Sequence, residues 1–128
     1  MRQRLIRIGV QVIVLSMITF AAFAGESPQM GMASFYSYEC ANQPMANGKI
    51  FDPERRTAAS WFYDLGTVLS VKSLDTGLVT KVVVTDRGPN KRLVKNGRII
   101  DLSKRAFQDI CVLKKGLTNV IVTVVSKE

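Results

Sequence analysis

Apolar and polar residues alternate along several segments of the chain, which predicts strands rather than helices. The clearest two segments, 67–73 and 78–85, are rich in β-branched residues and flank an Asp-Thr-Gly turn at 75–77. This arrangement predicts a β-hairpin. Further strands are predicted at 32–37, 98–102 and 118–125, the last of which is apolar enough for a central position.

One helix is predicted, together with the residue that caps its start and the face that it buries. Ser103 is a suitable N-cap for residues 104–110, where Ala106, Phe107 and Ile110 fall on one side. About six short strands and one clear helix favour a small β-barrel or sandwich over a βαβ array.

Two segments carry strong turn and loop signals. Residues 38–56 contain Asn-Gly and Asp-Pro pairs, which are typical of a loop. Residues 86–89, Asp-Arg-Gly-Pro, predict a sharp turn directly after the second hairpin strand.

The first 24 residues have the three parts of a secretory signal peptide. Three arginines lie among residues 1–7, residues 8–21 are mostly apolar, and Ala22-Phe23-Ala24 matches the small-x-small cleavage pattern. The alternative is an uncleaved membrane anchor, for which the apolar run is short. We expect cleavage after Ala24 and export to the periplasm or outside the cell, without stable membrane insertion.

The organisation expected after cleavage is a short linker at 25–30 and one domain at 31–128. No cysteine lies near the cleavage site, so a lipoprotein anchor is not predicted. Cys40 and Cys111 allow one intramolecular pairing, and an oxidising compartment favours a disulfide between them. The alternative is two unpaired buried thiols.

Composition narrows the possible chemistry. The 128 residues include 18 Lys and Arg, 10 Asp and Glu and no His, for a net charge of +8. The lack of histidine excludes imidazole metal sites and Ser-His-Asp or Cys-His catalysis. We expect no metal and no cofactor, and an exported chain makes nucleic acid a poor candidate partner.

Six motifs occur in an order that resembles the rare lipoprotein A (RlpA) family. They are Gly-Met-Ala-Ser-Phe-Tyr at 31–36, Met-Ala-Asn-Gly-Lys-Ile-Phe-Asp at 45–52, Thr-Ala-Ala at 57–59, Leu-Gly-Thr at 65–67, Val-Thr-Asp-Arg-Gly-Pro at 84–89 and Gly-Arg-Ile-Ile-Asp-Leu-Ser at 97–103. The similarity spans about residues 31–126.

The resemblance implies a mainly β fold, a six-stranded double-psi β-barrel with one or two short helices, related to expansins. It also implies a lytic transglycosylase that cuts peptidoglycan glycan strands in the bacterial envelope. In that reaction the muramic 6-hydroxyl attacks intramolecularly, so one carboxyl group can act as base and acid in turn. The alternative is a non-catalytic, expansin-like module that binds the wall. We expect a monomer.

Two aspartates are the candidate catalytic residues. Asp86 matches the catalytic Asp of the family, and Asp101 corresponds to an Asp that expansins carry. Each has a structural alternative, because an Asp at a turn or before a helix also bonds nearby backbone N–H groups. Together they are expected to face one groove.

Two positions depart from the pattern of active family members. Lys49 stands where they have Glu, and Ser60 stands where they have His. A lysine does not replace a carboxylic acid as a proton donor at ordinary pKa values. If the groove forms around Asp86, we expect the Lys49 ammonium to lie near the Asp86 carboxylate.

Substrate-binding residues are expected in the same motifs. The set comprises Tyr36, Asn47, Lys49, Thr57, Ser60 and Arg87. Phe35, Tyr36, Trp61 and Tyr63 are candidates for stacking on sugars, with simple packing as the alternative. The basic segment 90–98 is either a solvated loop or a surface that attracts anionic wall polymer.

Overall fold

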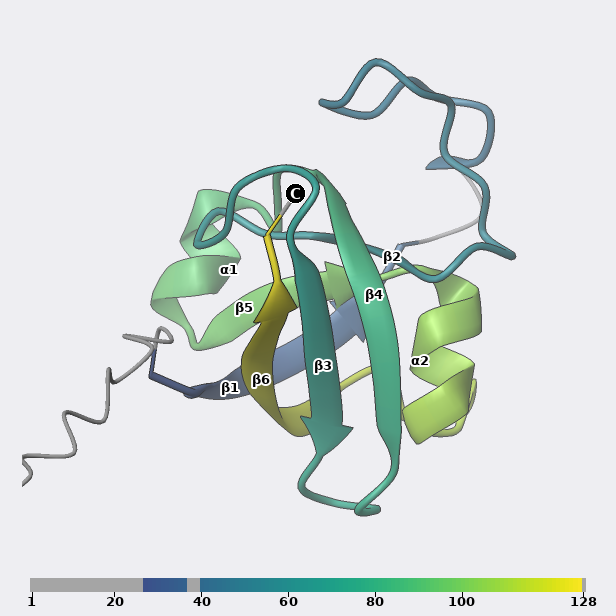
Figure 1. Cartoon of the computed structure of the whole chain (residues 1–128). Coiled ribbons are helices and arrows are strands. Elements are labelled where there is room, and N and C mark those ends of the chain that lie inside the picture. Colours follow the sequence, from purple (N-terminus) through teal and green to yellow (C-terminus); the bar gives the residue numbers. More distant parts are fainter. Residues whose placement is uncertain (1–26, 37–39, 128) are drawn as a thin grey trace, which may run out of the picture.

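The computed structural model describes residues 27–36 and 40–127. In it the chain folds into a closed barrel of six strands (Figure 1). The strand order around the barrel is β1–β5–β2–β4–β3–β6. The strands are β1 (Gln29–Phe35), β2 (Thr57–Ala59), β3 (Val68–Ser73), β4 (Val79–Asp86), β5 (Arg98–Leu102) and β6 (Thr118–Ser126). The predicted mainly β, six-stranded barrel is confirmed.

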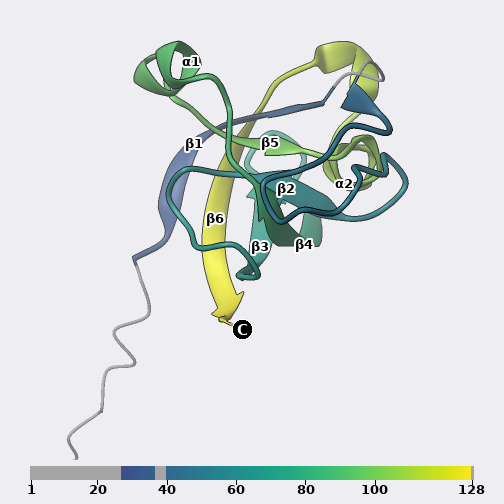
Figure 2. The same cartoon turned by 90° about the horizontal axis from the view of Figure 1, so that it is seen from above.

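Two of the six strand pairs are parallel. β1 runs parallel to β5 and β2 parallel to β4, whereas the other four pairs are antiparallel. Figure 1 shows β3 and β4 in front of β1 and β5, and Figure 2 gives the same barrel from above. In the part of the chain that the structure describes, no helix is long and apolar enough to span a bilayer.

Side chains point alternately into and out of the barrel along each strand, and the inward ones fill its interior. The inward positions of the longer strands are almost completely buried: Leu69, Val71, Val82, Val84, Ile100, Leu102, Val120 and Val122. Burying one such side chain contributes about 1.5–3 kcal/mol relative to leaving it exposed. The period of two that predicted the strands is therefore also what builds the core.

Two short helices and a 3₁₀ turn lie outside the barrel: α1 (Lys91–Lys95), α2 (Lys104–Ile110) and η2 (Leu113–Lys115). The helix predicted at 104–110 is confirmed, and Ser103 Oγ accepts the Ala106 N–H at 3.3 Å as its N-cap. Phe107 is fully buried and its ring centroid lies 4.9 Å from that of Phe35. This contact fixes α2 against the end of β1.

The hairpin predicted at 67–73 and 78–85 is confirmed as β3 and β4. Gly77 adopts a φ of 77° in the connecting turn, a conformation that glycine adopts without steric cost. Asp75 anchors the turn to β6, because its carboxylate accepts the Thr118 hydroxyl at 2.8 Å and the Asn119 N–H at 2.9 Å. These hydrogen bonds lower the pKa of Asp75.

Three elements differ from the sequence-based expectation. β1 begins at Gln29, three residues before its predicted start, because Gln29 and Met30 also pair with β6. β2 has only three residues, too few for an alternation pattern, and it forms because β4 and β5 flank it. The segment 90–98 contains α1, whose N-cap is Asn90.

Close packing at Gly31 yields a test of the fold. A Cβ atom at this position would lie 2.7 and 2.8 Å from Ile99 Cγ2 and Cγ1, and 3.0 Å from the Gly97 carbonyl oxygen. We expect Gly31→Ala to lower the free energy of unfolding by about 1–3 kcal/mol through overpacking. Urea denaturation followed by circular dichroism measures it.

The matched control is Met30→Ala, because the neighbouring Met30 is 68% exposed. We expect this change to stay within about 0.5 kcal/mol of the parent. Equal stability of the two variants would contradict the close approach of β1 and β5.

Candidate active site

The two candidate catalytic aspartates lie in one row across four strands. Ser34 of β1 is in register with Asp101 of β5, Asp101 with Ala59 of β2, and Ala59 with Asp86 of β4. Ala59 is fully buried and has the smallest chiral side chain, so the strand between the two carboxylates adds little bulk. The register therefore brings Asp86 and Asp101 to the same level of the barrel on β4 and β5, with β2 between them.

The Asp86 carboxylate is held by three hydrogen bonds. Its Oδ1 atom accepts the N–H of Ala46 at 3.0 Å and that of Arg87 at 2.8 Å. Its Oδ2 atom accepts the phenol of Tyr36 at 3.2 Å. Asp86 therefore joins the end of β1, the end of β4 and the long segment that precedes β2.

Tyr36 lies close enough to both carboxylates to be affected by their charges. Burial raises its pKa first, and the negative charges of Asp86 and Asp101 raise it further. The phenol consequently keeps its proton at ordinary pH and remains a donor to Asp86. The Tyr36 ring centroid lies 5.0 Å from that of Phe51, which fixes the ring in place.

Asp101 is partly buried and has different partners from Asp86. Burial raises its pKa, while a hydrogen bond from the Ser34 hydroxyl and the charge of Arg98 act in the opposite direction. A carboxyl group with a raised pKa holds its proton to higher pH, as a general acid must.

Gly88 completes the wall between these groups. A Cβ atom on Gly88 would lie 3.7 Å from Asp101 Oδ2, 3.7 Å from the Tyr36 hydroxyl oxygen and 3.3 Å from Ala59 Cβ. The absence of a side chain therefore leaves the carboxylate and the phenol unobstructed on this side.

Two predicted substrate-binding residues have mainly structural contacts. The Arg87 guanidinium donates to the carbonyl oxygens of Ser60 and Tyr63 at 3.4 and 3.0 Å. Ser60 is fully buried, and its hydroxyl accepts the Phe62 N–H at 3.1 Å. Sequence reasoning placed both near Asp86, and the Ser60 N–H indeed donates to the Asp86 carbonyl oxygen, but not to its carboxylate.

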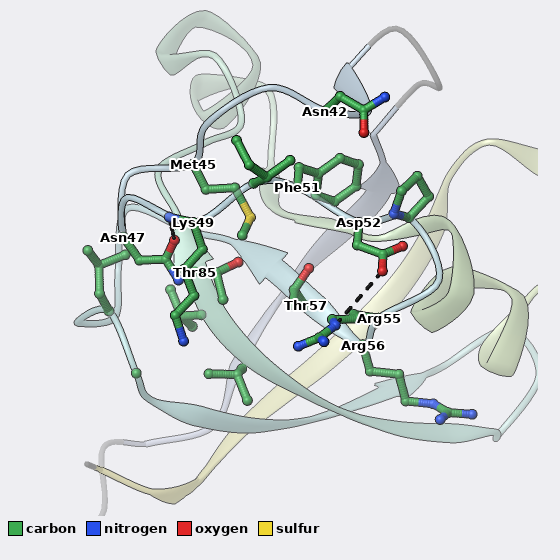
Figure 3. Close-up of a pocket in the computed structure, with 16 residues that line it drawn as sticks. Asn42, Met45, Asn47, Lys49, Phe51, Asp52, Arg55, Arg56, Thr57 and Thr85 are labelled. Atoms are coloured by element: carbon green, nitrogen blue, oxygen red, sulfur yellow. Dashed lines mark hydrogen bonds and ion pairs between the residues drawn. The ribbon is translucent and has the colours of Figure 1, made fainter.

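The other predicted residues lie around a second hollow of about 970 Å³, which we call the Lys49 pocket (Figure 3). Its lining includes Asn47, Lys49, Asp52, Arg55, Arg56, Thr57 and Thr85. Met45 and Phe51 line both this pocket and the smaller hollow that contains Tyr36 and Asp86. The segment that covers the Lys49 pocket thus also borders the aspartate site.

The expected approach of the Lys49 ammonium to the Asp86 carboxylate does not produce an ion pair. Among the described residues, no ion pair joins them within 4.0 Å, and Asp86 takes its hydrogen bonds from Tyr36, Ala46 and Arg87 instead. The Lys49 N–H donates to Asn47 Oδ1 at 3.0 Å in a tight turn, and the side chain lines the Lys49 pocket. Lys49 therefore belongs to the lining of this pocket, whereas Asp86 belongs to the smaller hollow.

The predicted disulfide is absent from the structure, and both Cys40 and Cys111 are thiols. Cys111 is buried in the core cluster at the end of α2. Cys40 lines the small hollow with Tyr36 and Asp86. The two thiols are thus held in different environments.

Of the four aromatic side chains considered for sugar stacking, only Trp61 is exposed, at 43%. Its indole N–H donates to the Pro89 carbonyl oxygen at 2.6 Å, and the Lys91 ammonium lies 4.8 Å from the ring centroid. Phe35 and Tyr36 pack against other rings, and Tyr63 is buried.

The sequence analysis missed Ser34 and Gly88 as parts of the site. Both belong to motifs quoted for the resemblance, but neither type of residue signals chemistry alone. No group of three or more His, Cys, Asp or Glu side chains suited to a metal occurs in residues 27–36 and 40–127.

The family model described as "Lytic transglycolase" matches residues 28–122, which is most of the chain. The chain belongs to this family. This membership agrees with the resemblance to the rare lipoprotein A proteins.

Several relatives of this family carry the name endolytic peptidoglycan transglycosylase RlpA. The protein from Helicobacter pylori is 38% identical over 90 residues, which cover 70% of this chain and 27% of the relative. The protein from Vibrio cholerae is 36% identical over 98 residues, which cover 77% of this chain and 36% of the relative. The chain thus spans about a quarter to a third of these relatives.

Solved structures support the fold of the lytic transglycolase family member. A Streptomyces papain inhibitor is 20% identical with a TM-score of 0.63, covering 80% of this chain and 97% of that one. A mutant Clavibacter michiganensis expansin in complex with cellohexaose is 21% identical with a TM-score of 0.58, covering 77% and 50%. Because the sequence identities are this low, the similarity to these structures supports the barrel fold only.

The contact between Ser34 and Asp101 gives a test of the site's electrostatics. Because a hydrogen bond to a carboxylate lowers its pKa, Ser34→Ala should raise the pKa of Asp101 further above its ordinary value. Carbon-13 NMR of the Asp101 carboxyl group as a function of pH measures the shift. Ser70→Ala, in β3, is the control, and an unchanged or lower pKa in Ser34→Ala would contradict the arrangement.

Proposed function

We propose that this chain cleaves peptidoglycan glycan strands as an endolytic transglycosylase and forms 1,6-anhydromuramic ends. The observation that carries the proposal is the row of Asp86, Ala59 and Asp101, with the Tyr36 phenol bound to Asp86. The relatives' names and the match to the lytic transglycolase family support it.

Two carboxyl groups in unlike surroundings suit the two proton transfers of this reaction. In the proposed mechanism, Asp101 gives its proton to the glycosidic oxygen as the bond from that oxygen to C1 breaks. Asp86 takes the proton of the muramic 6-hydroxyl as its oxygen bonds to C1. No water is consumed. One turnover leaves Asp86 protonated and Asp101 ionised, so Asp86 releases its proton to solvent and Asp101 takes one up before the next turnover.

Tyr36 and Trp61 have supporting roles in this proposal. The Tyr36 phenol orients Asp86 by donating to Oδ2, and it remains protonated because its pKa is raised. Trp61 offers a half-exposed ring that its bond to Pro89 holds beside the 86–89 turn. A sugar ring can stack on such a fixed aromatic surface.

Replacing the aspartates tests catalysis. We expect Asp86→Asn and Asp101→Asn each to lower the rate of 1,6-anhydro end formation on peptide-free glycan strands by about 100-fold or more, the usual contribution of a proton-transferring group. Mass spectrometry of the released products measures the rate. Asp64→Asn is the control, because Asp64 is exposed and outside the row.

A second candidate function is a non-catalytic module that binds glycan. Lys49 and Ser60, at the positions where active members have Glu and His, favour it. To decide between the two candidate functions, the parent protein is also incubated with insoluble sacculi, and both the bound protein and the released soluble products are measured. Sedimentation with sacculi without any soluble release supports the binding module, and intact strands at high protein concentration overturn the catalytic proposal.

Export to the envelope belongs to the same proposal. The basic start, the apolar run and Ala22-Phe23-Ala24 support cleavage after Ala24. We expect N-terminal sequencing of the protein from the envelope fraction to begin at Gly25. An intact Met1 in purified membranes would contradict cleavage and would favour a membrane anchor.

A further inference from the structure

The Lys49 pocket adjoins the aspartate site but contains neither catalytic carboxylate. Thr85, the residue before Asp86, lines it, and Met45 and Phe51 line both hollows. In addition, the Asn47 N–H donates to the Thr85 carbonyl oxygen at 3.1 Å. A polymer bound over Asp86 is therefore beside this pocket.

The charges around the pocket leave one cation without an acidic partner. The Arg56 guanidinium binds Asp109 through two hydrogen bonds, at 2.5 and 3.2 Å, and Arg55 lies 3.8 Å from Asp52. Within residues 27–36 and 40–127, no acidic group lies within 4.0 Å of the Lys49 ammonium. The pocket therefore offers a single positive charge for an anion.

Two hydroxyl groups in the pocket also lack partners. Thr57 Oγ1 and Thr85 Oγ1 are buried and make no hydrogen bond to any described residue, and Thr85 is only 8% exposed. Figure 3 shows both hydroxyls directed toward the space below Met45 and Phe51, with Lys49 at one side. A buried hydroxyl without a partner is destabilising, so rotation of either threonine side chain toward an acceptor in this space gives its hydroxyl a partner.

These features favour a small monoanion with an apolar flank. Bidentate recognition of a phosphate group uses an arginine fork, and the fork of Arg56 is already bound to Asp109. A carboxylate needs one ammonium and a few hydroxyl donors. The apolar flank of such a ligand fits Met45 and Phe51, which form the wall toward Asp86.

We propose that the Lys49 pocket binds a carboxylate of peptidoglycan, with the Lys49 ammonium as its ion-pair partner and the Thr57 and Thr85 hydroxyls as donors. The inference rests on the proposed function, since it places this group on a strand bound over Asp86. The carboxylate has two sources, the lactyl side chain of a muramic acid without peptide and the C-terminus of a stem peptide.

The experiment measures dissociation constants by isothermal titration calorimetry with three probes. They are a GlcNAc–MurNAc tetrasaccharide with free lactyl carboxylates, the same tetrasaccharide as its methyl ester, and a free stem tetrapeptide. Lys49→Met removes the charge, and Lys81→Met, on the exposed face of β4, is the matched control. We expect Lys49→Met to weaken binding of the free acid about five- to tenfold and to leave the ester unchanged.

A second variant separates binding from folding. Thr85→Val keeps the shape of the side chain and removes a hydroxyl that has no partner among the described residues. We expect its melting temperature to equal or exceed that of the parent while it binds the free acid more weakly. If the substitution merely impaired folding, both the melting temperature and the affinity for the free acid would fall.

The outcomes distinguish this inference from the proposed function. Equal affinity of the parent for acid and ester, or equal weakening of both by Lys49→Met, overturns the carboxylate site and leaves glycan cleavage standing. Lys49-dependent binding of the tetrapeptide alone supports the site with the peptide as source. Absence of binding to either saccharide, with no Lys49-dependent peptide binding, overturns both.

Discussion

The position of β2 between β4 and β5 is the constraint on which the site depends. β2 has three residues, and its last residue, Ala59, is in register with Asp86 on one side and Asp101 on the other. The irregularity between Ala58 and Ala59 in the pairing with β4 sets which residue of β4 reaches this level. A shift of one residue would turn a carboxylate to the other face of the sheet.

The hydrogen bonds around Asp86 extend this constraint to the long segment before β2. Ala46 donates to the Asp86 carboxylate, and Asn47 donates to the Thr85 carbonyl oxygen. Arg56, at the other end of the segment, binds Asp109 of α2, which lowers the pKa of Asp109. The segment that carries Lys49 is therefore fixed to the barrel at two separate places.

The sequence predicted those parts of the molecule that depend on local patterns. The β3–β4 hairpin and α2 follow from alternation, turn residues and the Ser103 cap. β2 was not predicted, because three residues carry no period and the strand forms only through its two neighbours. Asp86 and Asp101 were named from motifs, yet no motif specifies that Lys49 lines a different hollow from Asp86.

The raised pKa of Tyr36 affects how the site exchanges protons with solvent. Its phenol keeps its hydrogen throughout the acidic and neutral range, so Tyr36 remains a hydrogen-bond donor to Asp86 and never becomes a further negative charge beside it. A change of pH within that range therefore alters the charge of the site only through groups other than Tyr36.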